Sequence, residues 1–169
     1  RDSISIIKIM DFKKILIILT LYLSSFNNAY SLEPEIFVQS TVNRASQILS
    51  ENISREKKIE KLKSIAKETV DIKGVGFYSL GSNRKNLNDD QIIMYSELFE
   101  SYFLKSFSSR LAEYTNPEIE VNGKEILNNN YTIVNSLLVG TSERPEVKID
   151  WRIYTKDPNN PLIRDLIIE

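Results

Sequence analysis

The side chains that could do chemistry in this chain are carboxylates, lysines, tyrosines and serines, because its 169 residues include no His and no Cys. This composition excludes disulfides, thiolate nucleophiles, Ser-His-Asp triads and nearly every zinc or iron site. Asp89 and Asp90 form a carboxylate pair with the residue types for acid–base catalysis. They follow Asn88 at the start of a strongly periodic segment, where acidic residues stabilise a helix N-terminus. We therefore interpret them as capping residues.

Two further patterns also have a structural interpretation. Gly74 and Gly76 lack the third glycine and the preceding strand of a dinucleotide-binding fingerprint, which indicates local helix packing. The lysines between residues 57 and 63 are typical of a solvated helix face, with contact to acidic lipid headgroups or a partner as the alternative. The formal net charge of -1 provides no overall basic field of the kind that nucleic-acid binders carry.

A third group consists of apolar side chains, for which two interpretations are possible. Aromatic residues are dense on the third and fourth predicted helices, and they either fill a core or, with one face of a predicted strand, line a cavity. Such a cavity would hold acyl chains by burial, at about 0.8 kcal/mol per CH₂. The candidate lining residues are Phe77, Tyr78, Leu80, Phe99, Tyr102, Phe103, Phe107, Val147, Ile149 and Trp151. Tyr78, Arg84 and Lys85 could contact a phosphate at its mouth.

The elements that position these residues begin with four predicted helices. Apolar residues recur at three- and four-residue spacing over residues 32–52, 54–70, 71–80 and 88–114. Ser54 and Asn88 are predicted N-caps, while Gly81 and Pro117 end the third and fourth helices.

After Pro117 the period changes to the alternation of β-strands, predicted near 119–122, at 131–139, at 146–155 and at 162–169. Asn122-Gly123 is a predicted turn, and in the third strand Val147, Ile149, Trp151 and Ile153 share one face. Helices followed by antiparallel strands predict an α+β domain, with the helices on one face of a sheet.

The N-terminus has the order of a secretory signal peptide. Met10 precedes Lys13 and Lys14, an apolar run at 15–23, and Ala29-Tyr30-Ser31 with the small residues of a cleavage site. The run is shorter than the roughly 20 apolar residues that cross a bilayer. We expect residues 1–9 to be upstream translation, residues 10–31 to be a signal peptide, and residues 32–169 to be one domain. The chain ends on a strand, and we expect its C-terminus to be truncated.

Several segments resemble the MlaC-type (toluene-tolerance) family of Gram-negative bacteria. Residues 77–84 read F-Y-S-L-G-S-N-R and resemble the family's "Y-x-L-G-x-x-W-R", and residues 95–104 resemble its long aromatic helix. Residues 145–153 and 162–169 resemble its strands "P-I-x-V-x-Y-R-L" and "W-K-V-Y-D-V-x-I-E-G-V-S". Asn83 and Leu162 stand where the family usually has Trp. The resemblance covers nearly all of residues 32–169.

The resemblance implies a nuclear-transport-factor-like fold around an apolar pocket that binds phospholipid tails and leaves the headgroup near solvent. It implies a periplasmic carrier, not an enzyme, with no cofactor other than its lipid cargo. The implied partners are an inner-membrane ABC transporter complex with a lipid-binding subunit and an outer-membrane lipoprotein–porin complex. Such a carrier would maintain the lipid asymmetry of the outer membrane.

Two other functions stay open. A small hydrolase or isomerase on the same fold would need a carboxylate with a raised pKa in the cavity, whereas the inward strand positions are apolar and Asp150 has the opposite phase. A periplasmic adaptor without lipid cargo would have a solid core, so a continuous cavity would count against it.

Overall fold

The computed structural model describes residues 32–169, which form one unit. The helices come first: α2 (Pro34–Ser50), α3 (Arg55–Thr69), α4 (Ile72–Leu80), the 3-10 helix η2 (Gly81–Asn86) and α5 (Asp89–Leu111). The strands follow: β1 (Ile119–Asn128), β2 (Tyr131–Leu138), β3 (Val147–Tyr154) and β4 (Leu162–Ile168). This is the predicted α+β architecture. The expected upstream segment 1–9 and signal peptide 10–31 lie outside the described residues.

The predicted N-caps Ser54 and Asn88 and the predicted end of α4 at Gly81 are confirmed, whereas α5 ends at Leu111, before the predicted stop at Pro117. The Ser54 side chain accepts a hydrogen bond from the Lys57 backbone N–H, and Asn88 forms a capping box with Gln91. Asp71 accepts from the Gly74 N–H at 2.8 Å and so caps α4. At the other end of α4, Gly81 has a φ of +54°, a conformation that favours glycine. No described helix is long and apolar enough to span a bilayer.

The strands form one antiparallel sheet in the order β1-β2-β3-β4. On β3, Trp151 and Ile153 are buried, as the predicted alternation requires, and Val134 lies opposite Trp151 on β2. These residues form a hydrophobic core with Val38 of α2, Ala66 of α3 and other apolar side chains. The inner face of the sheet therefore packs against the helices.

The predicted turn at Asn122-Gly123 is wrong. Strand β1 continues through it, with a register shift between Val121 and Gly123, and pairs with β2 as far as Asn128. The hairpin turns instead at residues 129–130, where the Asn130 N–H donates to the Asn128 side chain at 2.9 Å. Pairing along the full length of β2 outweighs the local turn preference, and the extra residue is absorbed as a bulge.

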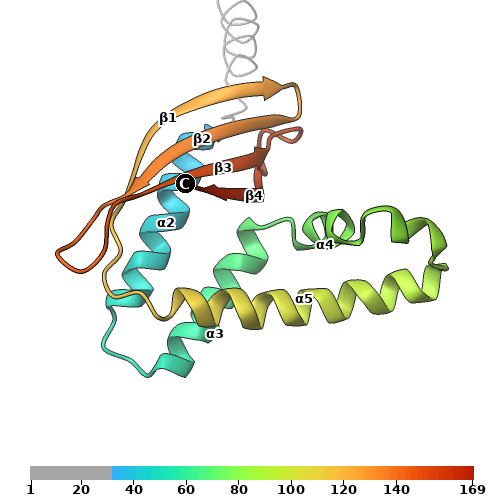
Figure 1. Ribbon diagram of the computed structural model, residues 1–169, viewed down its shortest axis with the longest axis horizontal. Coiled ribbons are helices and arrows are strands. Elements are labelled where there is room, and N and C mark those ends of the chain that lie inside the picture. Colours follow the sequence, from blue (N-terminus) through green and yellow to red (C-terminus); the bar gives the residue numbers. More distant parts are fainter. Residues whose placement is uncertain (1–31) are drawn as a thin grey trace, which may run out of the picture. The chain divides into compact units, whose positions relative to one another are not determined.

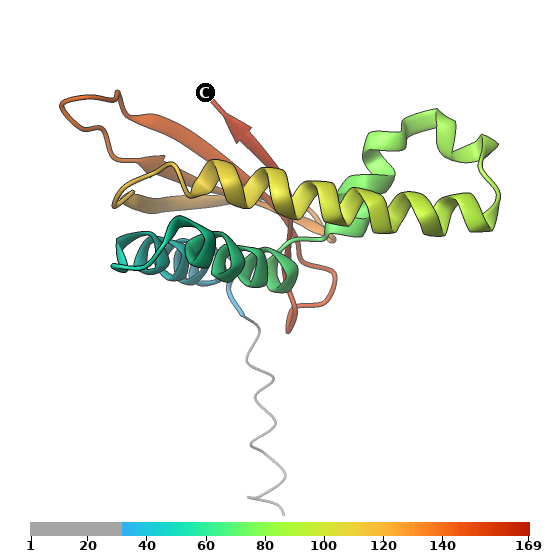
Figure 2. The ribbon, with the colours of Figure 1, turned by 90° about the horizontal axis from the view of Figure 1, so that it is seen from below.

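Helix α2 packs against β1 and β2, and α3 packs against both α2 and α5 (Figures 1 and 2). The N-terminal half of α5 extends away from the sheet, with α4 folded back along it (Figure 2). Gly76 permits this close approach, because a Cβ there would lie 2.8 Å from the Phe99 ring. The predicted packing role of Gly76 is thus confirmed.

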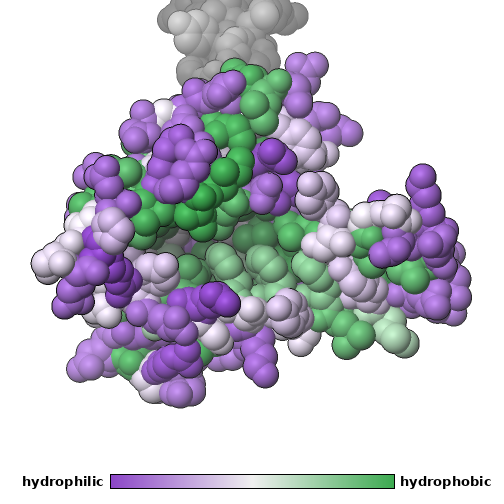
Figure 3. Space-filling model, in the orientation of Figure 1, coloured by the Kyte–Doolittle hydropathy of each residue, from purple (hydrophilic) through white to green (hydrophobic). Residues whose placement is uncertain are grey.

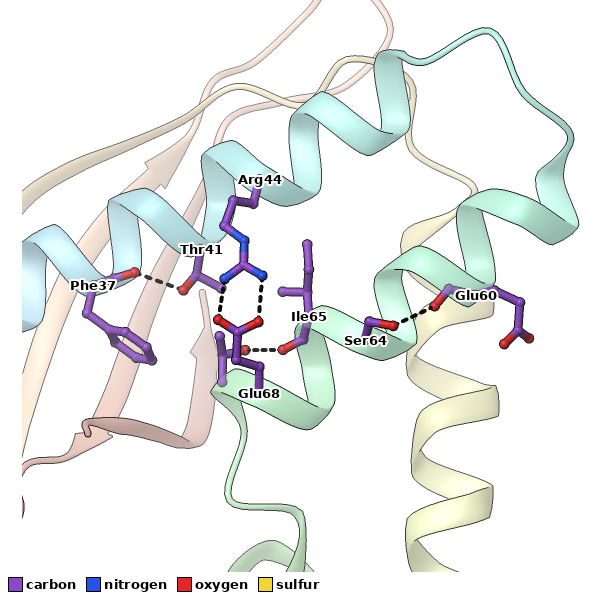
Figure 4. A network of polar contacts seen from close by, with 8 residues as sticks. Phe37, Thr41, Arg44, Glu60, Ser64, Ile65 and Glu68 are labelled. Atoms are coloured by element: carbon purple, nitrogen blue, oxygen red, sulfur yellow. Dashed lines mark hydrogen bonds and ion pairs between the residues drawn. The ribbon is translucent and has the colours of Figure 1, made fainter. Parts of the chain in front are cut away.

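An ion pair joins the first two helices. The Arg44 guanidinium donates two hydrogen bonds to the Glu68 carboxylate, at 2.7 and 2.6 Å (Figure 4). Both side chains are largely exposed to solvent, so we expect the pair to contribute at most about 1 kcal/mol to stability. Its two-pronged geometry fixes the position of α2 relative to α3.

Candidate functional site

A cavity of about 410 Å³ lies between the inner face of the sheet and helices α2, α3 and α5. Figure 3 shows hydrophobic residues gathered around a hollow between the sheet and α5. The lining comes from every layer of the domain and is almost entirely apolar. It includes Val42, Ala45 and Leu49 of α2; Leu62, Ile65 and Ala66 of α3; Phe107 and Leu111 of α5; and Ile119, Leu138, Ile149, Trp151, Ile163, Leu166 and Ile168 of the strands.

Three side-chain hydroxyl groups in this lining, those of Thr41, Ser46 and Thr69, are hydrogen-bonded to the main chain. Thr41 Oγ1 donates to the Phe37 carbonyl at 2.8 Å (Figure 4), and Thr69 Oγ1 donates to the Ile65 carbonyl at 2.8 Å. Ser46 Oγ donates to the Pro117 carbonyl at 2.8 Å. Because these three hydroxyls have partners on the main chain, Arg110 and the Tyr114 hydroxyl are the polar groups that the described lining leaves for a ligand. The cavity is therefore suited to hydrocarbon.

A short chain of hydrogen bonds holds Trp151 in the cavity wall. The indole Nε1–H donates to Ser136 Oγ at 2.8 Å, and that hydroxyl donates to the Ile149 carbonyl at 2.9 Å. Ser136 is only 1% exposed, so water does not compete for these bonds. The indole ring is thus fixed with its polar edge toward the sheet while its apolar surface lines the cavity.

The structure brings three of the predicted lining residues together around this cavity: Phe107, Ile149 and Trp151. Their role as lipid contacts stays a prediction. The other candidates are not part of the lining. They are Phe77, Tyr78, Leu80, Phe99, Tyr102, Phe103 and Val147.

The position of α4 explains why its residues lie outside the lining. The chain turns at Asp71, whose N–H donates to the Ile163 carbonyl at 2.9 Å, and α4 then runs along α5 rather than over the sheet. Tyr78 is 82% exposed as a result. Phe77 lies under the Arg84 guanidinium, 4.5 Å from the ring centre.

On α5 the aromatic side chains form a stacked row. Neighbouring ring centres are 5.7 Å apart for Tyr95 and Phe99, 6.2 Å for Phe99 and Phe103, and 5.3 Å for Phe103 and Phe107. Phe99 and Phe103 pack against the core, and only Phe107 reaches the cavity. The helical spacing correctly places these residues on one face, but that face is longer than the cavity.

The predicted phosphate contacts, Arg84 and Lys85, lie in η2, beyond the far end of α4. Neither residue lines the cavity. Sequence reasoning instead missed Arg110, the one charged residue among the described residues of the lining. It also missed Tyr114, which lines the cavity beside it and stacks with Arg144, 5.0 Å from the ring centre. The sequence did hold one indication of this end of the cavity, because Tyr114 is the last residue of the periodic apolar row that begins on α5.

The lining offers little to acid–base or metal chemistry. No Asp or Glu is among the described residues that surround the cavity. Across residues 32–169, no group of three or more acidic side chains could hold a metal ion. The apolar lining can instead shield part of an apolar ligand from water.

Comparison with known proteins agrees with this geometry. The solved structure of the phospholipid-binding protein from Ralstonia solanacearum, in complex with a phospholipid, has a TM-score of 0.65 and 16% sequence identity. The similarity covers 82% of this chain and 79% of that one, and it shows a shared fold. A search of curated proteins finds no match. The family model described as MlaC protein matches residues 39–169, and the chain therefore belongs to the MlaC family.

Proposed function

We propose that this protein is a periplasmic carrier that binds the acyl tails of a phospholipid in its cavity. It would shuttle lipid between the outer and inner membranes as the soluble component of an ABC transport system that maintains outer-membrane lipid asymmetry. The observation that carries this proposal is the apolar cavity of about 410 Å³ between the sheet and α2, α3 and α5. Burial of the tails in this cavity is the chemistry that the carrier requires.

The size of the cavity sets the amount of hydrocarbon that it shields. A methylene group is about as large as a water molecule, which occupies about 30 Å³ in the liquid, so 410 Å³ accommodates about 14 such groups. This corresponds to one acyl chain or to the inner halves of two. At about 0.8 kcal/mol per methylene, the gross gain is about 11 kcal/mol, which offsets the loss of freedom of the bound lipid.

Family membership supports the carrier, as does the phospholipid bound by the Ralstonia solanacearum protein of the same fold. The remaining parts of the proposal come from the sequence. Residues 10–31 would direct export and be removed after Ser31. The proposed partners are an inner-membrane ABC transporter complex with its membrane-anchored lipid-binding subunit and an outer-membrane lipoprotein–porin complex.

The cavity favours the carrier over the two alternatives. An adaptor that binds only proteins has no use for an apolar cavity of this volume. A hydrolase would need a carboxylate or another proton-transfer group beside the substrate, and the described lining offers no carboxylate.

The decisive experiment is native mass spectrometry of the protein purified without detergent, combined with solvent extraction. We expect phospholipid to co-purify at about one molecule per chain, with the mass of the extracted lipid giving its number of tails. A well-folded protein that carries no lipid, and that takes none from vesicles, would favour the adaptor.

A variant that fills the cavity makes this test specific. Ala45 lines the cavity from α2, so Ala45→Phe should exclude part of the tails. Losing two buried methylenes weakens binding by about 1.6 kcal/mol, or more than tenfold. The matched control is Gln47→Phe, which adds a ring on the exposed side of the same helix. Binding is measured by quenching of the single tryptophan, Trp151, with phospholipid brominated on its tails.

A further inference from the structure

Three arginines from three separate segments lie near the last turn of α5, where Arg110 and Tyr114 line the cavity. Arg110 lines the cavity in the last turn of α5, next to Tyr114. Arg144, in the connection between β2 and β3, stacks with the Tyr114 ring at 5.0 Å. Arg55, at the start of α3, donates to the Ser109 carbonyl at 3.2 Å, so its guanidinium lies beside the same turn of α5.

No carboxylate of residues 32–169 forms an ion pair with these arginines. Ten ion pairs join side chains within residues 32–169, and none includes Arg55, Arg110 or Arg144. The acidic residues on the neighbouring segments form no ion pair with them; these are Glu113, Glu118, Glu143 and Glu146. By contrast, Arg44, Arg152 and Arg164 all have carboxylate partners.

The contacts that these arginines do make leave hydrogen-bonding capacity for a ligand. A guanidinium has five N–H donors, and Arg55 uses one for the Ser109 carbonyl. The Arg144 guanidinium lies over the Tyr114 ring, 5.0 Å from its centre, and its N–H donors form no hydrogen bond with the described residues. Arg55 and Arg110 can be explained without a ligand, because positive side chains stabilise the negative end of the α5 helix dipole. This does not account for Arg144, which belongs to a different segment.

We propose that Arg110 and Arg144 bind the phosphate of a phospholipid whose tails occupy the cavity. This inference rests on the proposed carrier function and adds to it the residues that recognise the phosphate of the cargo. Planar guanidinium groups match the oxygens of a phosphate and can bind it through two hydrogen bonds each. The protein would thus select lipids that carry a phosphodiester next to the glycerol, and would reject neutral lipids with the same tails.

The test compares the affinities of the full chain for phosphatidylglycerol and for diacylglycerol, two lipids that carry identical brominated tails. Binding is followed by the quenching of Trp151 fluorescence. The wild type should bind the phospholipid at least about tenfold more tightly. The double variant Arg110→Gln/Arg144→Gln should lose that preference while it keeps its affinity for diacylglycerol, which also shows that it is folded. The matched control Arg84→Gln/Lys85→Gln removes the same charge from η2 and should keep the preference.

Each contrary result has a separate meaning. A wild type that binds both lipids equally, or a double variant that keeps the preference, would overturn the phosphate site and leave the carrier intact. A wild type that binds neither lipid would overturn the carrier and the phosphate site together. Calorimetry with inorganic phosphate alone identifies the source of the anion: binding as tight as that of the phospholipid would reassign the arginines to a free anion.

Discussion

Replacing Ser136 by alanine should destabilise the fold through the indole of Trp151. The Ser136 hydroxyl accepts from Trp151 Nε1 at 2.8 Å and donates to the Ile149 carbonyl at 2.9 Å, at a position that is 1% exposed. Alanine removes the acceptor and leaves the indole N–H without a partner in an apolar wall. Leaving a buried donor unsatisfied costs about 1–3 kcal/mol, so we expect unfolding to become easier by about 2 kcal/mol.

The measurement is equilibrium unfolding in urea, followed by circular dichroism and by the fluorescence of Trp151. The midpoint should fall while the dependence on urea concentration stays the same, because the surface exposed on unfolding hardly changes.

A double-mutant cycle separates the hydrogen bond from simple loss of packing. Trp151→Phe removes the donor, so Ser136→Ala made in that background has no indole N–H to leave unsatisfied. The coupling between the two changes should be about 1–2 kcal/mol. Additive effects of the two substitutions, or a Ser136→Ala protein as stable as the wild type, would refute the view that this bond holds the indole in place.

Three further predictions concern stability. Gly81→Ala should destabilise the protein by about 1–3 kcal/mol in thermal melts, because a residue with a side chain is strained at φ +54°. The control Gly123→Ala should have little effect in the same melts, because the added methyl group meets only the Asn135 side chain, at 3.7 Å. Asn88→Ala should cost about 1 kcal/mol, because it removes the N-cap of α5; an unchanged melting temperature would contradict this. The hydrogen bond from Arg44 lowers the pKa of Glu68 below its ordinary value of 4.5, so the stability from this pair is present above that pH and is lost as the pH falls through the lower folded pKa. Urea midpoints measured from pH 6 downward should therefore converge for the wild type and Glu68→Gln, with at most about 1 kcal/mol between them at pH 6.

The sequence predicts correctly those features that depend on residues close together in the chain. The caps at Ser54 and Asn88 each join residues three positions apart, and Gly81 ends α4 through its own backbone conformation. Alternation likewise places Trp151 and Ile153 on the buried face of β3. These features need only local hydrogen bonds and a periodic hydrophobic pattern.

Where partners are distant in the chain, the local signal is insufficient. Asn122-Gly123 has the residues of a turn, but β2 offers β1 a continuous set of hydrogen-bonding partners on both sides of it. The total gain from pairing eight residues of β1 with β2 exceeds the preference of two residues for a turn. The sequence could not reveal this because it does not show which strand lies alongside.

By itself, then, the sequence determined the order of helices and strands, the caps at Ser54, Asn88 and Gly81, the apolar face of the elements and the resemblance to one family. Only the tertiary structure decided that the helices leave a cavity, and which part of each apolar face borders it. Phe99, Phe103 and Phe107 share one stripe on α5 and all pack against the core, yet only Phe107 also lines the cavity. The difference arises because α5 is longer than the sheet that it crosses, so one periodic pattern meets different neighbours along its length. The same packing brings Arg110 and Arg144, from separate segments, to the Tyr114 ring beside the cavity, since side-chain proximity depends on how the elements pack and not on their spacing in the chain.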